Sequence, residues 1–151
     1  MNLKKTLLVV AALCLIASTP LAADLWGTWA GSGKGNCYPH PGVVIYPWQN
    51  WKGEVYKTED QDAPIFEGEW YDELGNYGTF KGNIYFPPIE EEAIAEGEWT
   101  WYDPDGTSAE PVVGGKFKMT FMFIEDYCKG SWKTIWPSTS AVGTMEGKDQ
   151  D

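Results

Sequence analysis

The chain has 151 residues with 22 acidic residues, 11 lysines and no arginine, so its formal net charge at pH 7 is −11. This balance disfavours nucleic acid and anionic membranes as partners, and phosphorylated ligands as well, because their recognition usually draws on arginine and on basic patches. The length fits one domain with one hydrophobic core.

The first 23 residues have the three parts of a secretory signal peptide. Lys4 and Lys5 form a positive start, residues 7–17 an apolar core, and residues 20–23 a cleavage region of small side chains. This apolar run is too short for a membrane-spanning helix, which needs roughly twenty residues. We therefore expect a signal peptide at residues 1–23 and a single exported domain at residues 24–151, periplasmic or extracellular, without a membrane span. The mature chain would have 128 residues and a formal charge of −13, because removal takes away two lysines and no acid.

Residues 66–86 predict a β-hairpin. Polar residues alternate with large apolar residues or glycine at a period of two, before and after a turn at residues 74–77. One face of the hairpin would hold Phe66, Gly68, Trp70, Phe80, Gly82, Ile84 and Phe86.

The Gly-x-Trp pattern of this hairpin occurs four times, and each copy is followed by a turn-rich segment and a second apolar-alternating strand. The sequence therefore predicts eight short strands in four sequential hairpins, an antiparallel meander. The four copies are Gly27/Trp29, Gly68/Trp70, Gly97/Trp99 and Gly130/Trp132.

Closure of this meander into an eight-stranded up-and-down β-barrel would bury the aromatic face and remove both sheet edges, so this is the predicted fold. In such a barrel the glycine of each Gly-x-Trp would leave room for a tryptophan of a neighbouring strand. Gly68 is accordingly expected on the inner face, where valine would overpack the core.

Gly27-Thr28-Trp29, near the mature N-terminus and ahead of a meander, resembles the first strand of the lipocalin and avidin-type barrels. Members of these families bind small, mostly apolar ligands inside the barrel, so the resemblance implies a barrel shape with an interior ligand as one option. Lipocalins close the barrel end with an arginine over that tryptophan, and this chain contains no arginine.

Cys37 and Cys128 are the cysteines that remain after removal of the signal peptide. An exported chain meets an oxidising compartment, so a disulfide between them is expected, with two free thiols or a redox pair as alternatives. In a strict up-and-down order these residues fall at opposite barrel ends. The proline-containing segment at residues 30–50 would then have to fold back, as an extra strand or a cap.

Charged residues offer three candidate sites. His40 is the only histidine and lies between two prolines, which favours an exposed loop position over a catalytic or zinc site. Asp103, Asp105 and Glu110 partly match a calcium loop, although Asp-Pro-Asp-Gly is also ordinary turn chemistry. Four glutamates could be arranged as acid and base pairs for glycoside cleavage, but their alternation places them on the solvated outer face. These are Glu67, Glu69, Glu96 and Glu98.

Aromatic residues outside the inward-facing set are the best indication of function. Tyrosine and tryptophan are favoured in contact surfaces because they combine apolar area with a polar group. Scattered exposed aromatics without a function are the alternative. The candidate ligand-binding residues are Tyr46, Trp48, Tyr102 and Trp136, with Tyr71 and Tyr85 also at outward positions.

We expect an exported, non-enzymatic binding or interaction module that contacts a protein or a glycan through the loops at one barrel end. The alternative is a lipocalin-like carrier of a small apolar ligand inside the barrel. An enzyme is not expected, since no nucleophile and base pair is evident. No cofactor is expected beyond the calcium option. A cavity above ~300 Å³ inside the barrel would favour the carrier.

Overall fold

The computed structural model describes residues 25–107, 109–136 and 140–151. The predicted signal peptide at residues 1–23 lies outside them. Within the described residues the chain is all-β apart from one short 3-10 turn, η1, at Phe123–Glu125. No helix in these ranges is long and apolar enough to cross a membrane.

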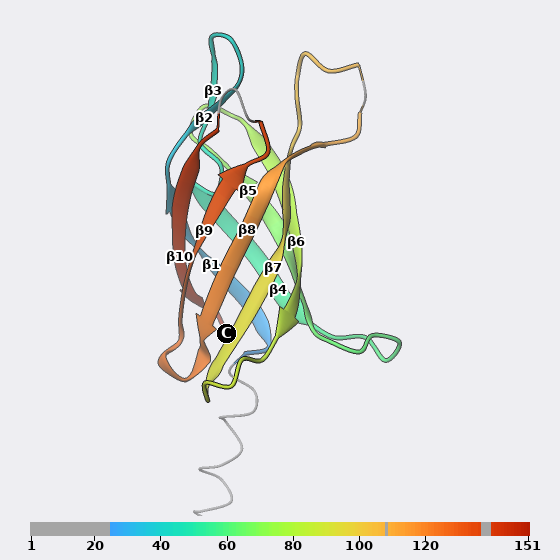
Figure 1. The fold of residues 1–151 in the computed structure, drawn as a ribbon, viewed down its shortest axis with the longest axis vertical. Coiled ribbons are helices and arrows are strands. Elements are labelled where there is room, and N and C mark those ends of the chain that lie inside the picture. Colours follow the sequence, from blue (N-terminus) through green and yellow to red (C-terminus); the bar gives the residue numbers. More distant parts are fainter. Residues whose placement is uncertain (1–24, 108, 137–139) are drawn as a thin grey trace, which may run out of the picture.

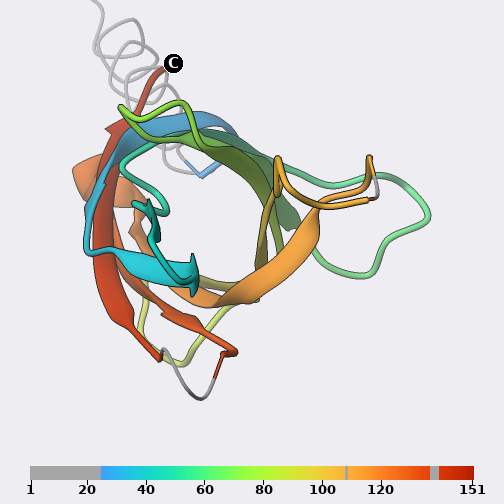
Figure 2. The same ribbon diagram turned by 90° about the horizontal axis from the view of Figure 1, so that it is seen from above.

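Eight of the ten strands in the described residues form a closed antiparallel barrel, and the other two form a small hairpin over one barrel end (Figure 1, Figure 2). The barrel strands pair in the order β1-β10-β9-β8-β7-β6-β5-β4, so the predicted eight-stranded up-and-down β-barrel is confirmed. The strands are β1 Gly27–Lys34, β2 Cys37–His40, β3 Val43–Ile45, β4 Asn50–Tyr56, β5 Ile65–Tyr71, β6 Tyr77–Tyr85, β7 Glu92–Trp101, β8 Val112–Met122, β9 Tyr127–Thr134 and β10 Val142–Asp149.

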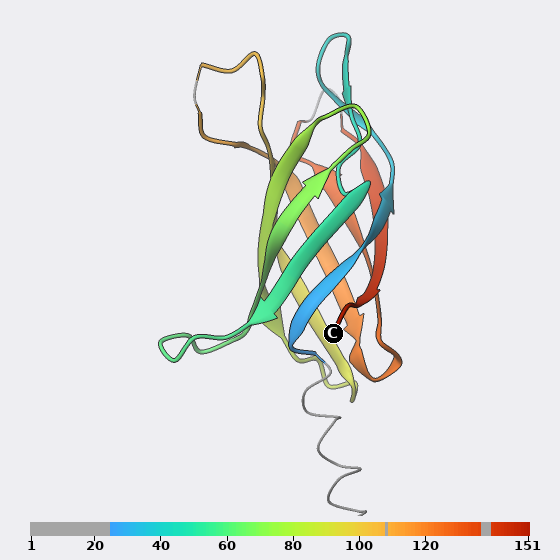
Figure 3. The same ribbon diagram turned by 180° about the vertical axis from the view of Figure 1, so that it is seen from behind.

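The predicted segment between the first and second barrel strands forms a cap, which we define as residues 35–49. It contains the β2–β3 hairpin and lies across the barrel opening when the molecule is seen from above (Figure 2). We call this the cap end of the barrel. The loop between β4 and β5 projects at the opposite end, and the described C-terminus also lies there (Figure 3).

The apolar and polar residues that alternate along each barrel strand lie on the inner and the outer face of the barrel, respectively. In β6 the side chains of Phe80 and Ile84 are each 2% exposed, whereas Lys81 between them points outward with 63% of its side chain exposed. The predicted inward position of Phe86 is wrong. This residue follows the end of β6, and its exposed fraction is 58%. A period of two places a side chain correctly only while the strand continues.

Glycines do make room for tryptophans, but not the glycines that the motif predicts. Trp70 lies opposite Gly78 of the next strand, and its Nε1 donates to the Thr100 carbonyl oxygen at 2.8 Å. A Cβ atom on Gly78 would lie 2.7 Å from that Nε1. Trp99 and Gly115 form the same arrangement. The accommodating glycine is therefore on the return strand of the hairpin.

Gly68, two residues before Trp70, faces a different neighbour. It pairs with Phe80, and a Cβ atom there would lie 2.7 Å from the Phe80 ring and 2.0 Å from the Lys52 carbonyl oxygen. Its inward placement is confirmed, while the side chain that occupies the space is a phenylalanine. The glycine thus allows close approach of the β4 backbone as well as ring packing.

The predicted disulfide is wrong. Cys37 lies in the cap, where it pairs with Ile45, whereas Cys128 is the second residue of β9, a strand that starts at the opposite end of the barrel (Figure 1). Both are buried free thiols, and burial raises the pKa of each to about 12. The barrel topology separates the two side chains, so an oxidising compartment alone would not join them.

Candidate functional site: the cap end of the barrel

Trp48 closes the barrel from the cap side. The turn at residues 46–49 places it on a backbone with φ of 64°, and the side chain is fully buried. Its ring stacks on Phe80 with centroids 4.2 Å apart and lies 4.9 Å from Phe117. The expected exposed loop position of Trp48 is therefore corrected, because the residue that follows Pro47 turns into the core.

Other aromatic rings fill the barrel below Trp48. Phe66 contacts Phe80 at 4.9 Å and Phe121 at 5.0 Å, and Phe121 in turn contacts Trp29 at 5.0 Å. These rings join the cap end to the opposite end through continuous packing. An apolar ligand inside the barrel would have to displace side chains that already occupy that space.

Asp72 holds the cap on the barrel. The residue is 3% exposed and begins the turn between β5 and β6. Oδ1 accepts hydrogen bonds from the backbone N–H groups of Leu74 (3.0 Å) and Asn76 (2.8 Å). Oδ2 accepts from the Asn76 side-chain amide at 2.8 Å and from the Tyr46 backbone N–H at 3.1 Å. A buried carboxylate satisfied in this way fixes both segments that it joins.

Sequence reasoning missed Asp72. An aspartate at the start of a Gly- and Asn-containing turn is the pattern of an Asx turn, which accounts for the bonds to residues 74 and 76. The bond to Tyr46 crosses 26 positions and has no local sequence pattern.

A second link joins the cap to the loop between β7 and β8. His40 Nε2 lies 2.6 Å from Asp103 Oδ2, with side-chain exposures of 46% and 13%. The Asp105 backbone N–H donates to Asp103 Oδ1 at 2.9 Å. The hydrogen bond with His40 lowers the pKa of Asp103 below its usual value. His40 is exposed, as expected, and also serves as a cap contact.

These contacts occupy the first residue of the predicted calcium loop. Both carboxylate oxygens of Asp103 already have partners within the protein. No group of three or more histidine, cysteine, aspartate or glutamate side chains in the described ranges is arranged to hold a metal ion. The calcium site at Asp103, Asp105 and Glu110 stays a prediction.

Tyr46, Tyr102 and Trp136 lie at the cap end, as the sequence indicated, and all three are partly buried. Trp136 packs edge-on against Trp99 with centroids 6.1 Å apart. Tyr102 stacks on Tyr77 at 4.8 Å with an interplanar angle of 27°. The structure thus adds Tyr77, which the sequence assigned only to a turn.

Exposed apolar side chains concentrate around this end. Tyr71 and Tyr77 are cross-strand neighbours, with exposures of 60% and 54%. Of the twelve exposed large apolar residues in the described part of the chain, four lie at the opposite end: Trp26, Tyr85, Phe86 and Ile89. The other eight, at the cap end, are Tyr38, Tyr71, Leu74, Tyr77, Val112, Val113, Ile135 and Val142.

The four glutamates considered as catalytic pairs lie on the outer barrel face. Glu67 accepts a hydrogen bond from the Tyr56 hydroxyl at 2.6 Å and lies 3.9 Å from Lys81 Nζ. Glu96 lies 3.9 Å from Lys118 Nζ. Such solvated ion pairs are typical of a barrel exterior.

A scan against protein-family models and searches of curated sequences and of solved structures find no match to this chain. Function must therefore be argued from the site itself.

Proposed function

We propose that this protein is an exported, non-enzymatic binding module that contacts its partner through the cap end. The observation that carries the proposal is a row of three tyrosines, the exposed Tyr71 and Tyr77 and the partly buried Tyr102, which we call the tyrosine platform. Tyr71 and Tyr77 are directly opposite each other, and Tyr77 and Tyr102 are stacked. Monomeric proteins expose contiguous apolar surface of this kind mainly where they bind something.

The platform is suited to a sugar ring. Its rings are apolar faces with hydroxyl groups at their edges. Tyr71 and Tyr77 project from paired strands and Tyr102 directly follows β7, so little conformational freedom is lost on binding. The high negative charge of the chain also favours a neutral partner at this end. A protein surface remains the alternative partner for the same residues.

Rigidity of the cap end supports the proposal. Asp72 joins Tyr46 to the turn that precedes Tyr77, and the His40–Asp103 contact joins the cap to the segment that follows Tyr102. The platform therefore sits between two anchored loops, which favours a preformed binding surface over one that folds on contact.

The carrier is the second candidate function, and one observation favours it. Trp48 combines a backbone conformation that is strained for a bulky residue with a buried indole Nε1 that has no hydrogen-bond partner among the described residues. In a carrier, movement of the Trp48 side chain out of the barrel would relieve the backbone strain and expose its Nε1 to water. The ligand would then occupy the space beside Phe80 and Phe117.

NMR of the isotope-labelled mature protein distinguishes these functions. Titration with neutral β-linked hexasaccharides of glucose and of N-acetylglucosamine should shift amide signals of the tyrosine platform. The double variant Tyr77→Ser/Tyr102→Ser should abolish the shifts, whereas Tyr85→Ser at the opposite end should not. Shifts confined to the indole signals of Trp48 and its neighbours, on addition of an apolar ligand, would favour the carrier instead.

A further inference from the structure

A second surface differs from the rest of the molecule in charge. The neighbouring strands β8, β9, β10 and β1 carry six lysines and two acidic residues, whereas the remainder of the chain carries five lysines and twenty acidic residues. We call the outer side of these four strands the lysine face. It is separate from the tyrosine platform, which lies on β5, β6 and the end of β7.

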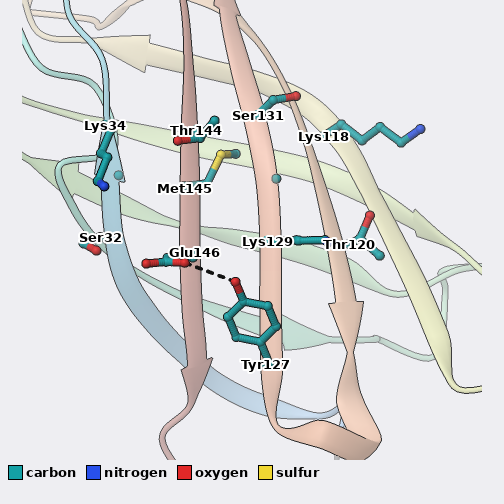
Figure 4. Close-up of a pocket in the computed structure, with 12 residues that line it drawn as sticks. Ser32, Lys34, Lys118, Thr120, Tyr127, Lys129, Ser131, Thr144, Met145 and Glu146 are labelled. Atoms are coloured by element: carbon teal, nitrogen blue, oxygen red, sulfur yellow. Dashed lines mark hydrogen bonds between the residues drawn. The ribbon is translucent and has the colours of Figure 1, made fainter.

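The lysine face contains a surface hollow of about 480 Å³ (Figure 4). Lys34, Lys118 and Lys129 reach it from three different strands. Its one carboxylate, Glu146, already accepts a hydrogen bond from the Tyr127 hydroxyl at 3.1 Å. Hydroxyl groups lie between the charges, on Ser32, Thr120, Ser131 and Thr144.

A second hollow of about 650 Å³ adjoins the first and shares Lys118 and Ser131 with it. It adds Lys116 and Lys133, which are directly opposite each other on β8 and β9, and two carboxylates of β7, Glu96 and Glu98. Glu96 lies 3.9 Å from Lys118 Nζ, and Glu98 is directly opposite Lys116. Like charges in directly opposed positions destabilise a sheet. Lys133, whose other cross-strand neighbour is Val142, has no carboxylate directly opposite it among the described residues, so a bound anion beside it would relieve this repulsion.

The lysine and hydroxyl side chains of the two hollows indicate which class of ligand they would bind. Lysine ammonium groups are point charges that attract carboxylates, and the chain has no arginine, the residue usually chosen for nucleic-acid phosphates. Alternating hydroxyl side chains can exchange hydrogen bonds with sugar hydroxyls. Two adjoining hollows along the strands suit an extended chain better than a single small anion.

We propose that the lysine face binds an acidic polysaccharide whose charges are carboxylates. The net negative charge of the chain disfavours such a partner only when it is averaged over the whole surface. The lysine face is the local exception, and surrounding acidic residues limit where the polymer can bind. This site does not depend on the function proposed for the cap end.

Isothermal titration with polygalacturonate oligomers tests the proposal. The triple variant Lys118→Gln/Lys129→Gln/Lys133→Gln removes three charges from the lysine face. The matched control, Lys52→Gln/Lys57→Gln/Lys81→Gln, removes three charges elsewhere. We expect wild-type binding that weakens with salt, about a tenfold or greater loss in the triple variant with a shallower salt dependence, and little change in the control.

The proposal is overturned if polygalacturonate does not bind, or if both triple variants lose affinity equally. Equal binding of polyglutamate or of a single-stranded oligonucleotide would also overturn it, because charge alone would then account for the affinity. Melting temperatures of both variants check that they fold. If the triple variant unfolds, Lys129→Gln and Lys133→Gln are tested singly, and each must weaken binding.

Discussion

At Trp48 the backbone adopts φ of 64°, a region that bulky side chains seldom occupy, and the buried indole Nε1 has no hydrogen-bond partner in the part of the chain that the structure describes. Both features cost stability. They persist because the ring fills the end of the barrel, in contact with Phe80 and Phe117. Packing at this one residue outweighs a strained conformation and an unmade hydrogen bond.

Trp48→Ala should lower the free energy of unfolding by about 3–5 kcal/mol, because a fully buried tryptophan leaves a cavity. Equilibrium denaturation in guanidinium chloride measures the change. Trp26→Ala, at a residue that is 39% exposed, is the control and should cost much less. Equal losses in the two variants would contradict the assignment of Trp48 to the core.

The two buried thiols give a second prediction at this scale. Burial raises the pKa of Cys37 and Cys128 to about 12, so both stay protonated at neutral pH and should not react with a disulfide reagent in the native protein. Denaturation should expose two reactive thiols per chain of residues 24–151. The protonated form is favoured on folding, so its contribution to stability is full below the unfolded pKa, near 8.5, and is lost as the pH rises toward 12. Absence of thiols after denaturation would restore the disulfide.

At the scale of elements, alternation predicted the strands well because each barrel strand has one buried and one solvated face. The sequence predicted only that the cap segment folds back. Its strands β2 and β3 have four and three residues, which is too short to show a period-two alternation of apolar and polar side chains. Trp48 was misplaced because a loop position next to proline gives no sign that a side chain enters the core. The roles of Tyr77 and Asp72 were not predicted either, because they depend on contacts with Tyr102 and Tyr46, which are distant in the sequence.

Gly68→Val tests the packing of the hairpins. The new side chain would begin 2.0 Å from the Lys52 carbonyl oxygen and 2.7 Å from the Phe80 ring, so backbone and core must both shift. We expect a loss of about 1–3 kcal/mol in the free energy of unfolding. Asn83→Val, on the outer face of β6, is the control and should be nearly neutral. A Gly68→Val variant that melts at the wild-type temperature would show that this face of β5 is not packed.

The contact between the cap and the β7–β8 loop should depend on pH. The pKa of Asp103 is lowered in the folded protein by His40, so its contribution is present above the unfolded value of about 3.9 and is lost as the pH falls through the folded value. Asp103→Asn should therefore lower the melting temperature at pH 7 and have little effect near pH 2. Asp105→Asn is the control. A difference that is the same at both pH values would contradict this role.

At the scale of the whole molecule, a closed barrel with a packed interior leaves its outer surface and its ends for contact with partners. Two surfaces then stand out for opposite reasons, the tyrosine platform for exposed apolar area and the lysine face for positive charge on an acidic protein. The sequence predicted the end of the barrel at which the aromatics gather. It did not predict the lysine face, because strands from both ends of the chain meet there only when the barrel closes.

Trp48 and its neighbours fill the barrel, and we propose that recognition takes place on its outside. Titration of residues 24–151 with the neutral apolar fluorophore N-phenyl-naphthylamine tests whether the interior is closed to ligands. The wild-type protein should give no saturable fluorescence increase, whereas Trp48→Ala should bind the probe in the space left by the indole. Stoichiometric binding by the wild-type protein, with shifts at interior tryptophan signals, would contradict the claim and identify a carrier.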